Sequence, residues 1–240
     1  MATFVIVPCH FLGAAAWERV GDVLQAAGHR VLAPDPRGWG ERRALLTSDT
    51  GLTTHVDELT QILVAEDLRG VTLIGHSYGG MVVAGVADRV PDRLAEVVFL
   101  DAPVPRHGDT LFDHLPEWVP DWYREHARTV GNGWRVPPPD LEVHGLPAAD
   151  LAWLAPMLGP VSLRTCEEPL EAPGDGAWAL PRSFVWCRGY AMFETTAARI
   201  RADPGWNYRE LASGHLPMVT HPAQTAELLM EVDRLGGDRP

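Results

Sequence analysis

The feature that most constrains the fold is the stretch LIGHSYGGMV at residues 73–82, in which Ser77 stands between Gly75 and Gly79. The apolar run at 71–74 predicts a buried strand, and the small-residue run at 79–89 predicts a helix directly after the turn. A G-x-S-x-G motif in this strand-to-helix context is typical of a nucleophile elbow. Both flanking positions need glycine, because side chains there would collide on so tight a turn. The stretch therefore predicts an α/β fold with a reactive serine at the edge of a sheet.

The rest of the chain alternates between strand and helix patterns. Further strands are expected at residues 3–7, 31–33, 96–100, 183–187 and 206–211, and helices at 17–27, 53–66 and 224–235. Gly28 is expected to end the first helix, and Thr53 or Thr54 to cap the second. Such alternation favours a mostly parallel sheet covered by helices on both faces.

Residues 103–180 interrupt this alternation. They hold five of the nine tryptophans and proline-rich stretches such as PEWVPDWY and RVPPPD, and they show no strand pattern. We interpret them as a lid inserted between two strands of a core formed by residues 1–102 and 181–240. The alternative is a long irregular surface excursion, which would leave clustered tryptophans in water, and large exposed apolar patches are rare.

A serine nucleophile needs a base and an acid, which in this fold follow it along the chain as acid and then histidine. His215 lies in ASGHLPMVTHP just after the last expected strand and is the candidate base. His221 precedes a proline at the start of a helix and is expected to be a surface or capping residue. His76, inside the elbow, is expected to pack beneath the turn.

Charge and composition exclude several classes of function. The formal net charge of −12 argues against a nucleic-acid partner, and the absence of lysine excludes Schiff-base chemistry. No apolar stretch is long enough to span a membrane, and the N-terminus lacks a basic leader region. Three cysteines without a CxxC pair suit a reducing cytoplasm. We expect a cytoplasmic protein with a small-molecule substrate, no nucleic acid and no membrane partner, and leave a homodimer open.

The chain resembles the α/β-hydrolase superfamily, especially the branch of plant methylesterases, hydroxynitrile lyases and small bacterial hydrolases. The resemblance rests on FVIVPCHFLGAAAW, DPRGWG, LIGHSYGGMV, VVFLDAPVP and SGHLPMVTHP, and the 103–180 segment falls where that family inserts its cap. It implies a Ser-His-acid triad that works with no cofactor and no metal.

The acid departs from the family pattern. It usually follows the strand expected at 183–187, where this chain has VWCRGYAMFE with Tyr190 in place of an aspartate. We predict Asp101, at the end of the preceding strand in VVFLDAP, as the acid, with Glu194 as the second choice. A turn or capping carboxylate is the ordinary alternative for Asp101.

The loop after the first strand also departs, because Pro8-Cys9 replaces the usual His-Gly. The resemblance implies that the backbone N–H groups of His10 and Tyr78 form the oxyanion hole, which a change of side chain need not destroy. Cys9 and His10 would then face the pocket. Cys9 is expected to line or pack the site, not to act as a second nucleophile.

These residues predict a serine hydrolase that cleaves a small apolar or aromatic ester, thioester or lactone. The altered loop and acid leave a second class open: a lyase, cyclase or acyl-transfer enzyme of secondary metabolism on the same scaffold. Hydroxynitrile lyases of this family carry a lysine after the catalytic histidine, and Leu216 stands there instead. A third class is a binding protein with an inactive triad, against which intact Ser77 and His215 argue.

Overall fold

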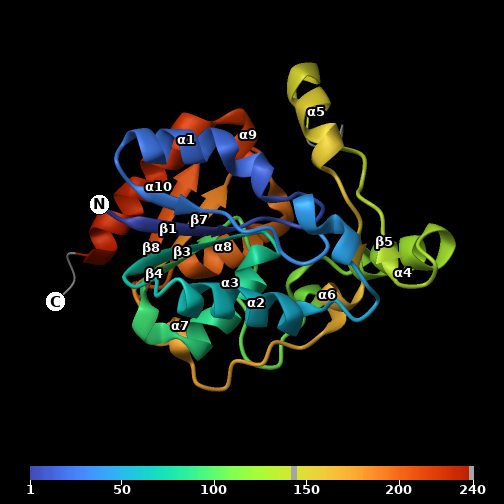
Figure 1. Ribbon diagram of the computed structural model, residues 1–240, viewed down its shortest axis with the longest axis horizontal. Coiled ribbons are helices and arrows are strands. Elements are labelled where there is room, and N and C mark those ends of the chain that lie inside the picture. The colour runs from blue at the N-terminus through green and yellow to red at the C-terminus, as the bar shows by residue number, and fades with distance from the viewer. Residues whose placement is uncertain (142–144, 238–240) are drawn as a thin grey trace.

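The core of the protein is a six-stranded sheet in the order β2-β1-β3-β4-β7-β8, and every neighbouring pair of strands is parallel (Figure 1). The computed structural model describes residues 1–141 and 145–237. The strands are β1 Thr3–Val7, β2 Arg30–Leu32, β3 Val71–His76, β4 Leu94–Leu100, β7 Arg182–Cys187 and β8 Asn207–Leu211. The predicted fold class is confirmed.

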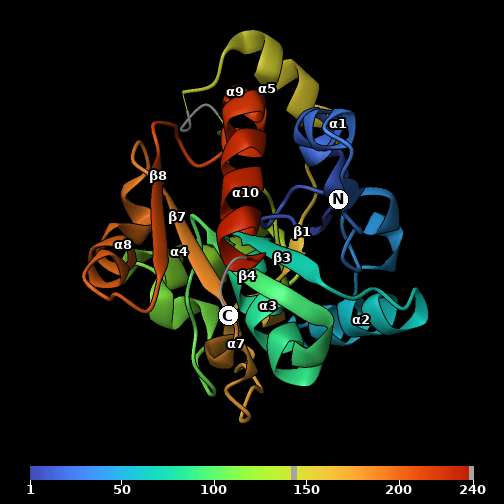
Figure 2. The ribbon, with the colours of Figure 1, turned by 90° about the vertical axis from the view of Figure 1, so that its left-hand side faces the viewer.

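Helices cover both faces of this sheet (Figures 1 and 2). One face carries α1 Glu18–Ala26, α9 Pro217–Thr220 and α10 Pro222–Gly237. The other carries α2 Leu52–Ala65, α3 Gly79–Arg89, α7 Gly176–Ala179 and α8 Glu194–Arg201. Short 3-10 helices lie at Ala14–Trp17, Gly40–Leu45, Pro91–Arg93, Leu111–His114, Ala155–Met157 and Ala191–Phe193. No helix in the described ranges is long and apolar enough to cross a membrane.

Alternate side chains of each central strand point to opposite faces of the sheet and pack into two separate hydrophobic cores. In β1, Phe4 and Ile6 pack with α1 and α10, whereas Val5 and Val7 pack with α2 and α3. All four side chains are at most 2% exposed. Burial on both faces explains why these strands appear in the sequence as continuous apolar runs.

Before α7, the segment between β4 and β7 forms a group of short elements to one side of the sheet, on the right in Figure 1. It contains α4 Trp118–Val130, β5 Arg135–Val136, α5 Ala148–Leu154, β6 Val161–Ser162 and α6 Arg164–Glu167. β5 and β6 pair as a small antiparallel sheet. The expectation of no strand in this segment was therefore wrong. Strands of two residues are too short to leave a periodic pattern in the sequence, so the sequence could not predict them.

The expected cap of α2 was also wrong. The helix starts at Leu52, its N-cap is Gly51, and the Thr54 hydroxyl accepts the Gly51 N–H at 3.2 Å. The N–H of Thr53 is bound instead by a carboxylate oxygen of Glu168, at 3.0 Å, from 115 positions away. A distant acid therefore satisfies one of the first-turn N–H groups that a local cap would bind.

Candidate active site

Ser77 occupies a strained turn between β3 and α3. Its φ is +53°, in the left-handed region that side chains rarely adopt. A Cβ at Gly75 would lie 2.4 Å from the Gly79 carbonyl oxygen, and one at Gly79 would lie 2.5 Å from the Val7 carbonyl oxygen. Because backbone fixes both contacts, only glycine fits at either position.

The start of α3 places backbone N–H groups next to Ser77 in the chain. The N–H of Ser77 donates to Leu100 and that of Gly80 donates to Ser77, at 3.2 and 2.8 Å. Within residues 1–141 and 145–237, the N–H of Tyr78 has no backbone acceptor. Unsatisfied N–H groups at a helix N-terminus favour negative charge beside them.

His215 follows β8 and contacts Asp101 at the end of β4. The distance from His215 Nδ1 to Asp101 Oδ2 is 2.6 Å, and the Cys187 N–H donates to the other carboxylate oxygen at 3.2 Å. Asp101 is fully buried and its φ is +43°. Glu194 instead lies exposed at the first residue of α8. Of the two candidate acids, Asp101 is the one placed against the histidine.

Two neighbouring rings contact the His215 imidazole, those of His76 and Tyr190. His76 is fully buried, and its Nε2–H donates to the backbone oxygen of His215 at 2.8 Å. The ring of Tyr190 stacks on the His215 ring, with centroids 4.2 Å apart and planes inclined by 24°. Where the family pattern has an aspartate, this chain therefore supplies a packing ring for the same histidine.

The buried surroundings set the protonation of this pair. Burial lowers the pKa of His215 to about 3, so the imidazole is neutral at rest. Burial also raises the pKa of the Asp101 carboxyl, and the hydrogen bond from Cys187 opposes that rise. With Nδ1 turned to Asp101, Nε2 is the ring nitrogen that faces away from the acid and can take a proton.

The loop after β1 brings Cys9 and His10 to the same place. Cys9 is 4% exposed, and burial raises the pKa of its thiol to about 12, which leaves it protonated and unreactive. The His10 side chain hydrogen-bonds to Tyr123 and Thr165, at 3.4 and 3.1 Å. Sequence reasoning did not identify Tyr123 or Thr165, because no local pattern links them to a loop more than a hundred residues away.

These groups open into a cavity of about 670 Å³. Ser77, His215, Cys9, His10 and Tyr78 line it together. Its remaining walls are mostly apolar and aromatic, with many residues from the 103–180 segment: Phe11, Leu12, Leu111, Leu115, Trp118, Val119, Trp122, Tyr123, His126, Pro138, Pro139, Asp140, Leu141, Leu158, Tyr190, Met192, Phe193 and Leu216. A cavity of this size and lining suits a small, largely apolar molecule.

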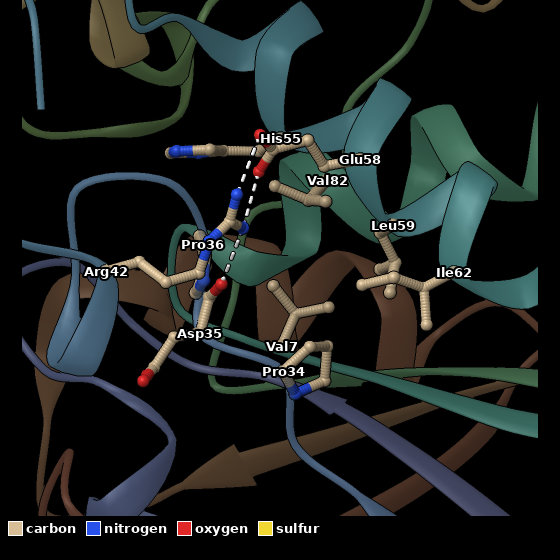
Figure 3. Close-up of a pocket in the computed structure, with 10 residues that line it drawn as sticks. All are labelled: Val7, Pro34, Asp35, Pro36, Arg42, His55, Glu58, Leu59, Ile62 and Val82. Atoms are coloured by element: carbon tan, nitrogen blue, oxygen red, sulfur yellow. Dashed lines mark hydrogen bonds and ion pairs between the residues drawn. The ribbon is translucent and has the colours of Figure 1, made fainter. Parts of the chain in front are cut away.

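A second pocket, between α2 and the loop after β2, is too small for a substrate (Figure 3). Its volume of about 20 Å³ holds little more than one water molecule. Arg42 spans it by donating to both carboxylate oxygens of Glu58, at 2.7 and 3.0 Å, and to the backbone oxygen of Asp35 at 3.1 Å. These contacts of Arg42 anchor the loop after β2 to α2.

Among the residues that the structure describes, no group of three or more His, Cys, Asp or Glu side chains could hold a metal ion.

Comparisons with known proteins agree with this fold. The family model of the α/β hydrolase fold matches residues 2–152. The carbendazim hydrolyzing esterase of Nocardioides sp. (strain SG-4G) is 35% identical over 239 residues, which cover 95% of this chain and 98% of that protein. Methylesterase 1 of Arabidopsis thaliana is 27% identical over 256 residues, which cover 95% of this chain and 95% of that protein.

Solved structures share the fold. An extracellular α/β-hydrolase from a Paenibacillus species superposes with a TM-score of 0.86 at 21% identity, covering 97% of this chain and 99% of its own. A variant of methylketone synthase I from tomato superposes with a TM-score of 0.80 at 19% identity, covering 98% of each chain. These two structures show the fold alone. The family match and the bacterial relative show that the chain belongs to the α/β hydrolase family, as a carboxylic ester hydrolase of the branch that includes the plant methylesterases.

Proposed function

We propose that Ser77 is the nucleophile of this ester hydrolase, His215 its general base and Asp101 the acid that orients the base. The observation that carries the proposal is the 2.6 Å hydrogen bond between His215 and Asp101, beside a serine on a strained elbow. Ser77 and His215 line one cavity, so both can reach the same bound ester. A serine hydroxyl needs such an oriented base, because it is a weak nucleophile at neutral pH.

The reaction proceeds through an acyl-enzyme. Ser77 Oγ attacks the ester carbonyl carbon while His215 Nε2 takes the hydroxyl proton. The resulting imidazolium, stabilised by Asp101, gives that proton to the leaving alcohol as the ester C–O bond breaks. Water then attacks the acyl group, again with His215 as base, and releases the acid and the free serine.

The backbone N–H groups of Tyr78 and His10 stabilise the oxyanion of each tetrahedral intermediate. The position of Tyr78 at the N-terminus of α3 supports this role, since the N–H has no backbone acceptor in the described ranges. Loss of one such donor typically costs about 10²- to 10³-fold in kcat.

The substrate is a small ester, thioester or lactone with an apolar or aromatic group. Tryptophan and tyrosine rings of α4 form one wall of the cavity, and arginine is absent from its described lining. Such a wall stabilises a flat apolar group and offers no cation to a substrate carboxylate. Residues 103–180 act as a lid that brings this wall over Ser77.

Intact mass after treatment with a fluorophosphonate tests the proposal, together with hydrolysis of p-nitrophenyl acetate. We expect one adduct on the unmodified protein, none on Ser77→Ala, and full labelling of Ser48→Ala, which changes an exposed serine elsewhere. Folded protein that neither forms an adduct nor hydrolyses the ester would contradict the proposal. The lyase, cyclase or acyl-transfer alternative would then account better for the fold.

A further inference from the structure

We infer that the imidazole of His10 fixes the oxyanion loop to the lid, so that Thr165 and Tyr123 are positioning residues for hydrolysis. The inference rests on the proposed function for its catalytic consequence, because that function places the His10 N–H in the oxyanion hole. The structural part, that the lid holds the loop through this side chain, stands on contacts alone.

The hydrogen atoms around His10 can be assigned without conflict. The Thr165 hydroxyl donates to the backbone oxygen of Ser162 at 2.7 Å, since a carbonyl oxygen only accepts. Thr165 Oγ1 is therefore the acceptor in its 3.1 Å contact with His10 Nε2, which must carry the ring hydrogen. His10 Nδ1 is then the acceptor for the Tyr123 hydroxyl at 3.4 Å. Both ring nitrogens are bound to the lid, one to α6 and one to α4.

Both His10 and Thr165 are shielded from water, so water cannot replace the hydrogen bond between them. His10 is 7% exposed and Thr165 is fully buried. Burial, together with the neighbouring His55, holds the pKa of His10 well below its usual range, so the ring stays neutral and keeps one hydrogen. A buried nitrogen that loses its partner is left unsatisfied, which is unfavourable.

The His10 ring also packs on the serine elbow. It stacks on the Tyr78 ring with centroids 4.1 Å apart and planes 23° apart, and the Trp39 ring lies nearly perpendicular to it with centroids 5.5 Å apart. The Tyr78 hydroxyl in turn bonds His55 Nδ1 at 2.9 Å. His10 therefore connects the lid to the residue that follows the proposed nucleophile.

The loop itself needs such support. Phe11, the next residue, has a φ of +70°, a strained conformation for a residue with a side chain. The Phe11 carbonyl accepts a hydrogen bond from the N–H of Gly159 at 3.0 Å, which is the third hydrogen bond between this loop and the lid. Three separate lid segments thus hold two consecutive loop residues in a conformation that the chain alone disfavours.

Thr165→Val tests the inference, because it removes the acceptor of His10 Nε2 with little change of volume and Thr165 does not line the cavity. With p-nitrophenyl acetate we expect kcat to fall about tenfold, less than the loss of a whole oxyanion donor, with KM unchanged. Fluorophosphonate labelling should slow by the same factor. Thr165→Ser should restore both rates, and the pH dependence should not change, because His215 and Asp101 are untouched.

Thr72→Val is the matched control. It removes one hydrogen bond from another buried threonine, which donates to Asp233. If it lowers kcat as much as Thr165→Val does, general destabilisation explains the effect and the inference is wrong. Should Thr165→Val not fold, Tyr123→Phe removes the other lid contact and is expected to lower kcat by a similar factor.

Hydrogen–deuterium exchange of the peptide covering residues 8–12 separates this inference from the proposed function. We expect faster exchange in Thr165→Val and unchanged exchange in Thr165→Ser and Thr72→Val. If the unmodified protein forms no adduct but the exchange result holds, the proposed function fails while the lid contact stands. If the enzyme is active and Thr165→Val changes neither exchange nor kcat, the inference is overturned.

Discussion

His215 and Asp101 form a hydrogen bond of 2.6 Å although 114 positions separate them in the chain. Since β7 lies between β4 and β8 in the sheet, the bond spans the end of an intervening strand. The last residue of that strand, Cys187, donates its N–H to the same carboxylate. An acid at the end of β4 can therefore replace one after β7, provided that its side chain reaches across this strand.

Asp101→Asn should lower kcat for ester hydrolysis by about 10³- to 10⁴-fold, because an amide no longer stabilises the imidazolium that forms during the reaction. Glu194→Gln changes an exposed residue of α8 and should leave kcat within about twofold. Steady-state kinetics with p-nitrophenyl acetate decides between the two acids. The reverse pattern, with a large loss in Glu194→Gln alone, would reject Asp101 as the orienting acid.

Gly75→Ala and Gly79→Ala should each destabilise the protein by about 3 kcal/mol or more, because the new methyl group would overlap backbone oxygen. Gly21→Ala is the control, since its Cβ would meet only Val31 at 3.9 Å and alanine is the better residue within α1. That change should raise stability by about 0.5–1 kcal/mol. Urea denaturation measures all three, and equal stability of Gly75→Ala and the parent would contradict the elbow geometry.

Local signals predicted most of the fold. The range predicted for α3 agrees with the structure at both ends, as does that of β1, because apolar periodicity and the elbow glycines act within a few residues. The loop position of His215 follows from chain order alone. These features needed no knowledge of distant contacts.

What the sequence could not predict depends on contacts between distant segments. Thr53 and Thr54 both have capping side chains, yet Glu168 binds the N–H of Thr53 from far along the chain. The choice of Asp101 over Glu194 depends on which carboxylate the sheet places beside His215. The lid contacts of His10 follow from packing that no spacing in the chain encodes.

Stability should fall as the pH is lowered from 6.5 to about 4, in part through His55. Burial lowers the pKa of this residue from 6.5 to about 4, so the folded state binds fewer protons than the unfolded state in that window. The free energy of unfolding therefore rises with pH there, by about 3 kcal/mol for this residue at most. His10 and His215 shift in the same direction.

His55→Gln isolates that contribution. The amide can still meet the Tyr78 hydroxyl and the Arg37 carbonyl, the two partners of His55, but it does not titrate. Urea denaturation at pH 7.0 and 4.5 should show a smaller loss of stability in the variant than in the parent. Equal losses in both proteins would mean that His55 is not a source of the acid sensitivity.

Trp118 should determine how well the enzyme binds aromatic acyl groups. It lines the cavity yet is 62% exposed, and it shares one face of α4 with Trp122 and His126 through four-residue spacing. A bound aromatic acyl group can cover the exposed part of such a side chain. Trp118→Ala should therefore raise KM for p-nitrophenyl benzoate about fivefold, corresponding to roughly 1 kcal/mol of lost apolar contact, and leave KM for p-nitrophenyl acetate unchanged.

Val130→Ala is the control, because it alters another exposed residue of α4 that does not line the cavity. It should change KM for neither ester. An equal rise in KM for both esters would indicate that Trp118 shapes the lid as a whole and does not select the acyl group.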